Sequence, residues 1–265
     1  MLSIEEIKLL IEKLEKVKKE DLQELIDSNL KILKDLELAG DANNKEIIDR
    51  MDKTPEWFMK DREEKMKKTN VDSLLRSQIQ AKIFQFAKTD IYNSLEIGPG
   101  NGMFSMDFRA WRLNFFLDIT FKIVPAILEK FNPLHRKYLK FYKTRNTECS
   151  NIPQGSCNFI FSWDTFVFFT QNHIQQYLHD IKRVLIPGGY CFIQYADCHY
   201  DIDLEQAKRG YWNYNTKTAM TKIIEDEGYE VVEMNQFRPG ANYAIFRKPG
   251  KQNPVVYKVS EIKLD

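Results

Sequence analysis

The most informative stretch for the fold of this chain is Ser94-Leu95-Glu96-Ile97-Gly98-Pro99-Gly100-Asn101-Gly102. It begins as a short apolar strand and runs at once into a turn with glycine at every second position. Glycine adopts positive φ angles without strain and has no Cβ between its backbone and a ligand. A dinucleotide-binding turn has the spacing G-x-G-x-x-G, whereas here the third glycine comes one residue early. The stretch therefore predicts either a ligand-binding turn of another type or a plain tight turn.

Strand-like and helix-length segments alternate around this turn. Strands are expected at 94–97, 113–117, 137–142, 158–162 and 190–195, and helices at 103–111, 120–131 and 171–185. This alternation predicts an α/β fold, in which a parallel sheet has helices on both faces. Two last strands, at 229–237 and 241–247, predict a C-terminal antiparallel hairpin. Ligands of such folds bind beyond the carboxyl ends of the parallel strands.

Residues 1–70 predict a separate helical appendage. The segment 3–38 contains neither glycine nor proline, and its apolar residues recur every three or four positions, as on one face of an amphipathic helix. We therefore divide the chain into an N-terminal helical appendage, residues 1–70, and a main domain, residues 71–265. The apolar stripes predict packing against the main domain, a homo-oligomer through these helices, or a cover over a substrate.

Composition excludes several classes of protein. The 265 residues include 39 Lys and Arg against 38 Asp and Glu, a net charge of +1, so no basic field marks a long nucleic acid as a partner. No stretch reaches the roughly 18–20 apolar residues of a membrane span, and the charged start excludes a signal peptide. The four cysteines form no CxxC pair and show no histidine at the spacing of a metal-ligand motif, which argues against a metal site. They predict reduced thiols and a cytoplasmic protein.

The glycine turn resembles the E/D-x-G-x-G-x-G signature of class I S-adenosylmethionine-dependent methyltransferases. The similarity extends over residues 94–247 and includes the segment 177–190, which resembles "yl.ei.RvLkPGG" with Pro187-Gly188-Gly189 as a turn into a strand. It implies a Rossmann-like, mostly parallel seven-stranded sheet and S-adenosyl-L-methionine as the cofactor. The segment 162–169 is also loosely similar to methyltransferases of bacterial surface-glycan gene clusters.

The resemblance assigns cofactor contacts to the strand ends. Asp118 stands where the family has an acid that binds both ribose hydroxyls, and a carboxylate can accept two hydrogen bonds from a vicinal diol; a solvated helix cap is the alternative. Glu148 falls on the acidic position of the stretch that pairs with the adenine amino group. The expected cofactor-binding residues are Glu96, Gly98, Gly100, Gly102, Asp118, Glu148 and Ser162.

Catalytic candidates follow the fourth and fifth strands. Methyl transfer to a hydroxyl gains from a nearby base, and the candidates are Asp164, Asp197 and His199. Histidine suits this role because it titrates near neutral pH, although His199 also fits a surface loop and Asp164 a helix cap. Phe168 stands where many relatives have a histidine, so no base is expected there.

The acceptor class follows partly from a missing motif. Enzymes that methylate exocyclic amines of bases or glutamine amides usually have [DN]-P-P-[YFW] after the fourth strand, where this chain has Ser162-Trp163-Asp164-Thr165. We therefore expect a small-molecule or glycan acceptor with a hydroxyl as nucleophile. The aromatic run 211–214 fits either a wall for a ring or plain packing. The alternative is a methyltransferase-like domain that serves mainly as a helix-mediated assembly or binding partner.

Overall fold

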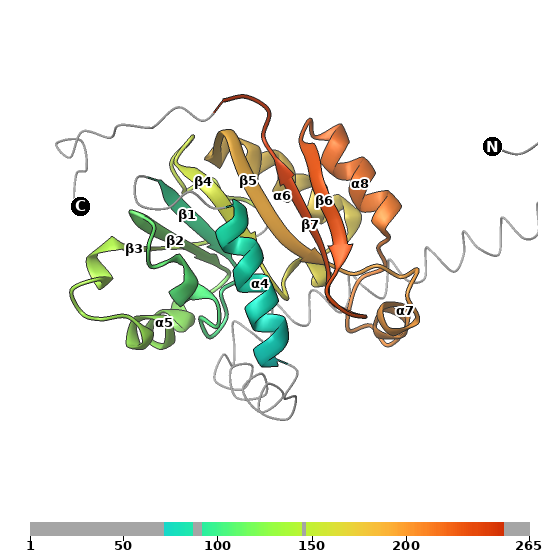
Figure 1. Ribbon diagram of the computed structural model, residues 1–265, viewed down its shortest axis with the longest axis horizontal. Helices are drawn as coiled ribbons and strands as arrows, with labels where there is room; N and C mark the ends of the chain where they lie inside the picture. The colour runs from blue at the N-terminus through green and yellow to red at the C-terminus, as the bar shows by residue number, and fades with distance from the viewer. Residues whose placement is uncertain (1–71, 87–91, 145–146, 252–265) are drawn as a thin grey trace, which may run out of the picture.

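The computed structural model describes residues 72–86, 92–144 and 147–251. Within them a seven-stranded sheet has the order β3-β2-β1-β4-β5-β7-β6 (Figure 1). Its strands are β1 (Asn93–Ile97), β2 (Leu113–Asp118), β3 (Leu139–Lys143), β4 (Cys157–Ser162), β5 (Leu185–Tyr195), β6 (Glu230–Gln236) and β7 (Asn242–Arg247). The helices are α4 (Asp72–Phe86), α5 (Val124–Lys130), α6 (Gln171–Val184), α7 (Asp201–Lys208) and α8 (Lys217–Asp226).

The sheet is parallel except at one side. β1 pairs in parallel with β2 and β4, β2 with β3, and β4 with β5. β7 runs antiparallel to both β5 and β6, so the predicted C-terminal hairpin is present. The predicted fold class, a mostly parallel seven-stranded α/β sheet with this hairpin, is confirmed.

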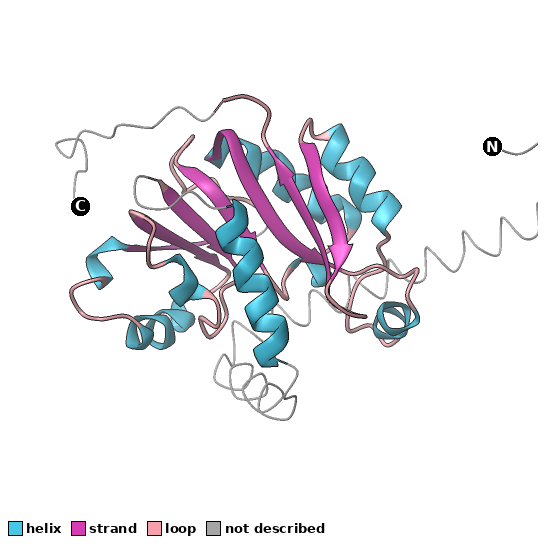
Figure 2. Ribbon diagram, in the orientation of Figure 1, coloured by secondary structure: helices cyan, strands magenta, loops and turns pink. Residues whose placement is uncertain are grey.

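Helices cover both faces of the sheet (Figure 2). α4 crosses one face, and α6 and α8 lie on the other. The spacing of apolar residues on α6 explains its orientation, because every residue of its apolar stripe is buried. These buried residues are Ile174, Tyr177, Leu178, Ile181 and Val184. Thr170 begins the helix by accepting a hydrogen bond from the backbone N–H of His173 at 3.2 Å.

The face under α4 is mainly aromatic. Phe104, Phe108 and Trp111 come from the segment after the glycine turn, and they contact Phe159 and Phe161 of β4 with ring centroids 5.2–6.3 Å apart. Tilted and edge-on pairs at these distances stabilise a core beyond the area that they bury. This layer joins the segment after the turn to the centre of the sheet.

Two local predictions were wrong. The helix expected at 103–111 is only a 3₁₀ turn, Ser105–Phe108, because its backbone closes through i→i+3 bonds such as Asp107 N–H to the Phe104 carbonyl at 2.8 Å. β5 begins at Leu185, five residues before the expected start, and Pro187-Gly188-Gly189 lies inside it at a break in the register with β4. Gly188 has a φ of 73° there, so the three residues form a bulge within the strand and not a turn before it.

The expected N-terminal helices, residues 1–70, lie outside the described residues, as do the oligomer contacts expected of them. Among the helices that the structure describes, none is long and apolar enough to cross a membrane.

Candidate active site

The parallel strands end at one edge of the sheet, and the predicted site residues follow those ends. The glycine turn follows β1, Asp118 ends β2, Asp164 follows β4, and Asp197 follows β5. The order of the strands along the chain reverses between β1 and β4. Such a reversal is where ligands bind in open α/β sheets.

The turn Gly98–Gly102 has left-handed backbone at each of its three glycines. Their φ angles are 66°, 53° and 73° for Gly98, Gly100 and Gly102, a region that residues with a Cβ rarely adopt. The Gly98 N–H bonds to the Leu117 carbonyl at 2.8 Å, and the Gly102 N–H bonds to the Pro99 carbonyl at 2.9 Å. The first bond fixes the start of the turn to β2, and the second closes the turn on itself.

Two of these glycines are also required by close packing. A Cβ on Gly98 would lie 2.1 Å from Oγ1 of Thr165, a residue that follows β4. A Cβ on Gly102 would lie 3.1 Å from Ile127 of α5 and 3.2 Å from Oγ of Ser105. Gly98 therefore lets the loop after β4 approach the turn, and Gly102 lets α5 approach it. The role of Thr165 could not be predicted from the sequence, because its contact with Gly98 joins segments that follow two different strands.

Glu96 and Ser162 lie beneath the turn. Glu96 is 3% exposed and accepts a hydrogen bond from Oγ of Ser105 at 2.6 Å. Ser162 is fully buried and donates to the carbonyl of Ile97 at 2.8 Å, which ties the end of β4 to the end of β1. Both side chains thus stabilise the position of the turn from inside the fold.

Asp118 and Asn101 are buried polar residues at the same edge. Oδ1 of Asp118 accepts a hydrogen bond from the Thr120 N–H at 3.1 Å, and the Asp118 carbonyl accepts one from the Thr144 N–H at 2.9 Å. Asn101, inside the glycine turn, is 6% exposed, and its Oδ1 is buried without a hydrogen-bond partner. A buried acceptor without a partner usually marks a place where a ligand or a water binds.

Glu148 comes from the segment after β3 and is exposed. Its carboxylate accepts a hydrogen bond from Oγ of Ser150 at 3.2 Å. The next residue, Cys149, is buried and donates its backbone N–H to Asp180 of α6. The segment is therefore anchored on α6, while the Glu148 carboxylate stays accessible.

Asp164 has left-handed backbone, with a φ of 60°. Aspartate is one of the few residues with a side chain that adopts this conformation. Its N–H bonds to Oε1 of Gln194 in β5 at 2.7 Å, and Nε2 of Gln194 donates to the Gly240 carbonyl in the hairpin loop at 3.1 Å. Gln194, which the sequence analysis missed, thus fixes the loop after β4 to the hairpin.

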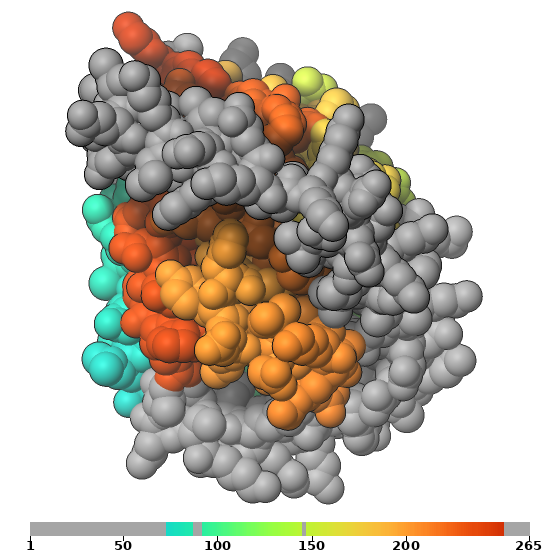
Figure 3. All heavy atoms as spheres, turned by 90° about the vertical axis from the view of Figure 1, so that its right-hand side faces the viewer, coloured from blue at the N-terminus to red at the C-terminus, as the bar shows by residue number. Residues whose placement is uncertain are grey.

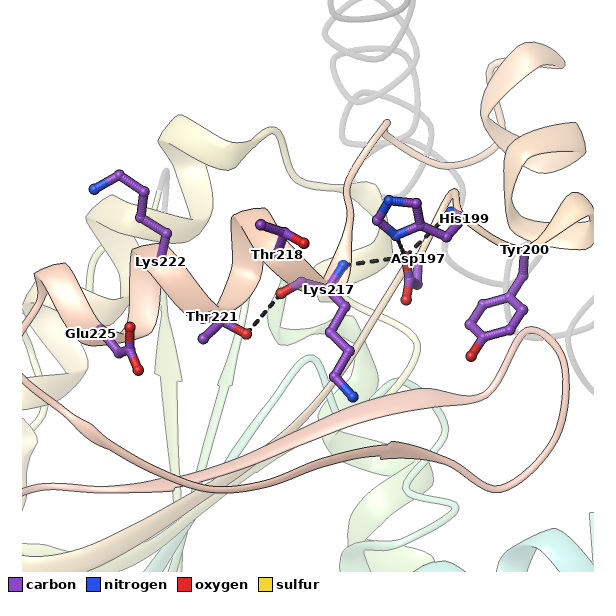
Figure 4. A pocket seen from close by; sticks show the side chains of 8 residues that line it. All are labelled: Asp197, His199, Tyr200, Lys217, Thr218, Thr221, Lys222 and Glu225. Carbon is purple, nitrogen blue, oxygen red and sulfur yellow. Dashed lines mark hydrogen bonds and ion pairs between the residues drawn. The ribbon is translucent and has the colours of Figure 1, made fainter. Parts of the chain in front are cut away.

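His199 and Asp197 form a hydrogen-bonded pair after β5. Nδ1 of His199 lies 3.0 Å from Oδ1 of Asp197, and the backbone N–H groups of His199 and Lys217 bond to the same oxygen at 3.3 and 3.2 Å. The Asp197 side chain is 4% exposed and the His199 side chain 61%. A carboxylate accepts from Nδ1–H, so the neutral ring keeps a lone pair on Nε2. Nε2 points away from Asp197 (Figure 4).

A second buried carboxylate supports this pair. Oδ2 of Asp203, in α7, accepts hydrogen bonds from the backbone N–H of Asp197 at 2.7 Å and from the amide of Asn242. Burial raises the pKa of Asp203 above its ordinary value, and the nearby charge of Asp197 adds to this, although the two hydrogen bonds act in the opposite direction. Burial also raises the pKa of the Cys198 thiol to about 11, so this neighbour is not a thiolate at neutral pH.

A groove of about 660 Å³ begins at the pair and follows the outer face of α8. Asp197, His199 and Tyr200 lie at one end, and Lys222 and Glu225 at the other (Figure 4). Lysine and threonine side chains of α8 line its middle: Lys217, Thr218 and Thr221. Figure 3 shows the side of the molecule that lies on the right in Figure 1. There α7 and the segment after it (light orange) are exposed next to the red-orange hairpin.

The sequence pattern of one family, described as a methyltransferase domain, matches residues 41–234. This match includes every predicted site residue. The chain belongs to the methyltransferase domain family. The predicted enzyme class, a methyltransferase, is therefore confirmed.

Several solved structures, among them two methyltransferases, have the same fold. An S-adenosylmethionine-dependent methyltransferase from Mesorhizobium loti is 12% identical, with a TM-score of 0.54 over 63% of this chain and 96% of that one. The PH0226 protein from Pyrococcus horikoshii is 13% identical, with a TM-score of 0.55 over 68% and 92%. NodS, an N-methyltransferase from Bradyrhizobium japonicum in complex with S-adenosylhomocysteine, is 14% identical, with a TM-score of 0.51 over 66% and 87%. Among curated proteins, none matches the sequence significantly.

The methyltransferase thus has most of its predicted site residues at one sheet edge. Glu96, Gly98, Gly100 and Gly102 belong to the turn and its base, and Asp118, Ser162, Asp164, Asp197 and His199 lie at or just after the ends of β2, β4 and β5. Glu148 comes from a separate segment on α6. Within the described residues no group of three or more His, Cys, Asp and Glu side chains is placed to hold a metal.

Proposed function

We propose that this methyltransferase transfers a methyl group from S-adenosylmethionine to a hydroxyl group of a small-molecule or glycan acceptor. The hydrogen-bonded pair of His199 and Asp197 carries this proposal. A hydroxyl is a weak nucleophile until it loses its proton, whereas an amine needs only its neutral form. An exposed imidazole held in one orientation by a buried carboxylate is therefore the group that a hydroxyl acceptor requires.

The residues of the turn fit the cofactor. S-adenosylmethionine supplies an activated sulfonium methyl group when bound, and its amino-acid part carries an ammonium that needs acceptors. Oδ1 of Asn101 is such an acceptor, buried and without a partner. The Asp118 carboxylate, 5% exposed, can accept hydrogen bonds from a ribose diol. We assign direct cofactor contacts to Gly100, Asp118 and Glu148, with Asn101 as a further candidate.

Four of the expected cofactor residues support the position of the turn in this proposal. Glu96 and Ser162 are buried and hydrogen-bonded to Ser105 and to the Ile97 carbonyl. The space where Gly98 would have a Cβ is occupied by Thr165, and that of Gly102 by Ile127 and Ser105. We therefore expect their substitution to weaken cofactor binding through the position of the turn, and not through a lost contact with the cofactor.

His199 acts as the general base. Its Nε2 accepts the proton of the acceptor hydroxyl as the oxygen attacks the methyl group, and the Asp197 carboxylate stabilises the imidazolium that forms. Because 61% of the His199 side chain is exposed, the proton can pass on to solvent. Asp164, after β4, is the second candidate and would orient the hydroxyl.

The position of the pair suits this role. β1 and β5 are separated only by β4, and neighbouring strands lie about 4.8 Å apart, so the ends of β1 and β5 are about 10 Å apart. The turn after β1 would therefore hold the cofactor within reach of the residues that follow β5. Proximity of this kind accounts for a large part of catalysis in group transfer.

The groove along α8 suits an uncharged acceptor with several hydroxyl groups. Its lining carries two ammonium groups, Lys217 and Lys222, and two carboxylates, Asp197 and Glu225. A site for an anion would lack the carboxylates, whereas hydroxyl groups both donate and accept hydrogen bonds. Tyr200, 39% exposed at the end nearest His199, offers a ring for the apolar face of a sugar or another small ring.

The alternative, a domain that mainly mediates assembly, is not favoured. A role in assembly does not account for the oriented imidazole of His199 or for the buried Oδ1 of Asn101 that has no hydrogen-bond partner. We also propose a cytoplasmic location for the enzyme. The four cysteines, all of them free and buried, support a reducing compartment.

Calorimetry with S-adenosylhomocysteine and a product screen test the proposed function. We expect micromolar binding, about −8 kcal/mol, and no binding of NAD. In the screen, labelled S-adenosylmethionine is offered with sugars, phenols, amines and phosphorylated sugars. Label on a hydroxyl of an uncharged acceptor supports the proposal. Clear binding of NAD without S-adenosylhomocysteine, or label on amines alone, would overturn it.

A further inference from the structure

Arg76 of α4 binds the segment that directly follows the glycine turn. Its Nη1 donates to the carbonyl of Met103, the residue after Gly102. Its Nη2 lies 3.1 and 3.0 Å from the two carboxylate oxygens of Asp107 in the 3₁₀ turn. Gln80, one helical turn further on, donates to Oδ1 of Asp107 at 2.7 Å. Two side chains of one helix thus converge on residues 103–107.

This cluster is enclosed by the fold. The Asp107 side chain is 4% exposed and that of Arg76 33%, and the guanidinium lies 5.3 Å from the ring centroid of Phe104. Charge-assisted hydrogen bonds in such surroundings are shorter and stronger than those between neutral groups. Burial raises the pKa of Asp107 above its ordinary value even though Arg76, Gln80 and the charge of Arg109 act to lower it.

The glycine turn depends on contacts of this kind. Gly98, Gly100 and Gly102 permit many backbone conformations, and only one of them has the observed φ angles. On one side Glu96 restrains the turn through Ser105. On the other side Arg76 restrains it through the Met103 carbonyl. A binding loop that is held in its bound conformation before the ligand arrives binds more tightly, because less conformational entropy is lost.

We propose that Arg76, with Gln80 and Asp107, is a positioning group for the cofactor turn, so that the docking of α4 on residues 103–107 sets the affinity for S-adenosylmethionine. The proposal rests on the proposed cofactor site. By thermodynamic reciprocity, cofactor binding must then stabilise the docked state of α4. Neither effect follows if Arg76 only adds stability to the fold.

Lys82 provides a matched control on the same helix. Its Nζ lies 2.7 Å from Oε2 of Glu233 in β6, so Lys82 also joins α4 to the sheet by an ion pair. This pair contacts the hairpin and not the segment after the glycine turn. Arg76→Ala and Lys82→Ala therefore each remove one ion pair of α4, but only the first removes a contact with the turn.

The experiment measures S-adenosylhomocysteine affinity of the full chain by calorimetry, well below the unfolding temperature of each variant. We expect Arg76→Ala to weaken binding about tenfold, as for one lost charge-assisted hydrogen bond, and Arg76→Lys to weaken it less. Lys82→Ala should bind within about twofold of the unchanged protein, because its ion pair with Glu233 lies at β6 and makes no contact with the turn. In hydrogen exchange, the ligand should slow α4 amides in the unchanged protein more than in Arg76→Ala.

The possible outcomes separate the two proposals. If the unchanged protein binds S-adenosylhomocysteine and Arg76→Ala binds it equally well, the positioning role is wrong and the proposed function stands. Equal weakening by Lys82→Ala would also overturn it, since the effect would then be one of general stability. If the unchanged protein does not bind, the proposed cofactor site fails. Should Arg76→Ala not fold, Arg76→Lys and Gln80→Ala give the same comparison.

Discussion

Nδ1 of His199 lies 3.0 Å from Oδ1 of Asp197, and the same oxygen accepts the first backbone N–H of α8, from Lys217, at 3.2 Å. One buried carboxylate therefore orients the imidazole and also begins the helix that lines the groove. An acid at a helix N-terminus is stabilised by the helix dipole. The position of the base and the position of the groove are thus coupled through Asp197.

Removal of the base should affect turnover and not cofactor binding. We expect His199→Ala to lower kcat by about 10²–10⁴-fold, the usual contribution of a general base, while S-adenosylhomocysteine affinity stays unchanged. Asp197→Asn should also lower kcat, because an amide can hold the ring in the wrong tautomer. Single-turnover rates and calorimetry measure the two quantities. Unchanged turnover in both variants would mean that catalysis relies on alignment, or that the acceptor is an amine.

Asp118 gives a prediction about affinity. Asp118→Ala should weaken S-adenosylhomocysteine binding by about 1.5–3 kcal/mol, the contribution of hydrogen bonds to a charged group. Asp118→Asn keeps one acceptor and should lose less. Calorimetry on both variants, with circular dichroism to verify folding, measures this. A dissociation constant equal to that of the unchanged protein would remove Asp118 from the site.

Gly98 gives a prediction about stability with a matched control. Gly98→Ala places a Cβ 2.1 Å from Oγ1 of Thr165 at a φ of +66°, whereas Gly155→Ala has a φ of +57° and nothing within 4 Å. Gly155→Ala should cost about 1–2 kcal/mol through backbone strain alone, and Gly98→Ala a further ~1–3 kcal/mol through overpacking. Urea unfolding measures both.

The contribution of Thr165 can be tested separately. In the Thr165→Gly background, the total cost of Gly98→Ala should fall to that of Gly155→Ala, because the Thr165 atoms that the new Cβ would contact are gone. An additional cost that stays the same in both backgrounds would show that Thr165 is not the obstacle.

Glu233 predicts a pH dependence of stability. Partial burial raises the pKa of Glu233, but hydrogen bonds from Lys82 and Tyr243 and the charge of Lys82 outweigh it, so the pKa lies below its ordinary value of 4.5. A lowered pKa means that the ionised form stabilises the fold above pH 4.5 and that this contribution is lost as the pH falls through the lowered pKa.

The variant Glu233→Gln should therefore be less stable than the unchanged protein at pH 7, by about 1 kcal/mol or less for a partly exposed pair. The difference should shrink as the pH falls below 4.5. Urea unfolding from pH 7 to pH 3.5 measures this. A difference that grows toward acid pH would contradict the assigned ion pair. Lys82→Met, which removes the partner cation, should show the same direction of pH dependence as Glu233→Gln.

The fold class and the place of the turn follow from the sequence alone. Apolar strands that alternate with helix-length segments allow few arrangements other than a parallel sheet with helices on both faces. Three glycines spaced two apart after the first strand permit a left-handed backbone, which the structure has at Gly98, Gly100 and Gly102. Pro187-Gly188-Gly189 was correctly placed near a strand, but its position inside β5 depends on pairing with β4, a contact that periodicity does not report.

The contacts that support the site residues depend on the tertiary structure. Thr165 packs against Gly98, Arg76 donates a hydrogen bond to Asp107, and Asp203 accepts one from the backbone of Asp197. In each case the partners belong to different elements of the fold. Local sequence determines backbone preference and burial pattern, because these depend on neighbours along the chain. Contacts between different elements depend on how those elements pack. They form only when the sheet edge, α4 and α7 come together, so the sequence pattern does not predict them.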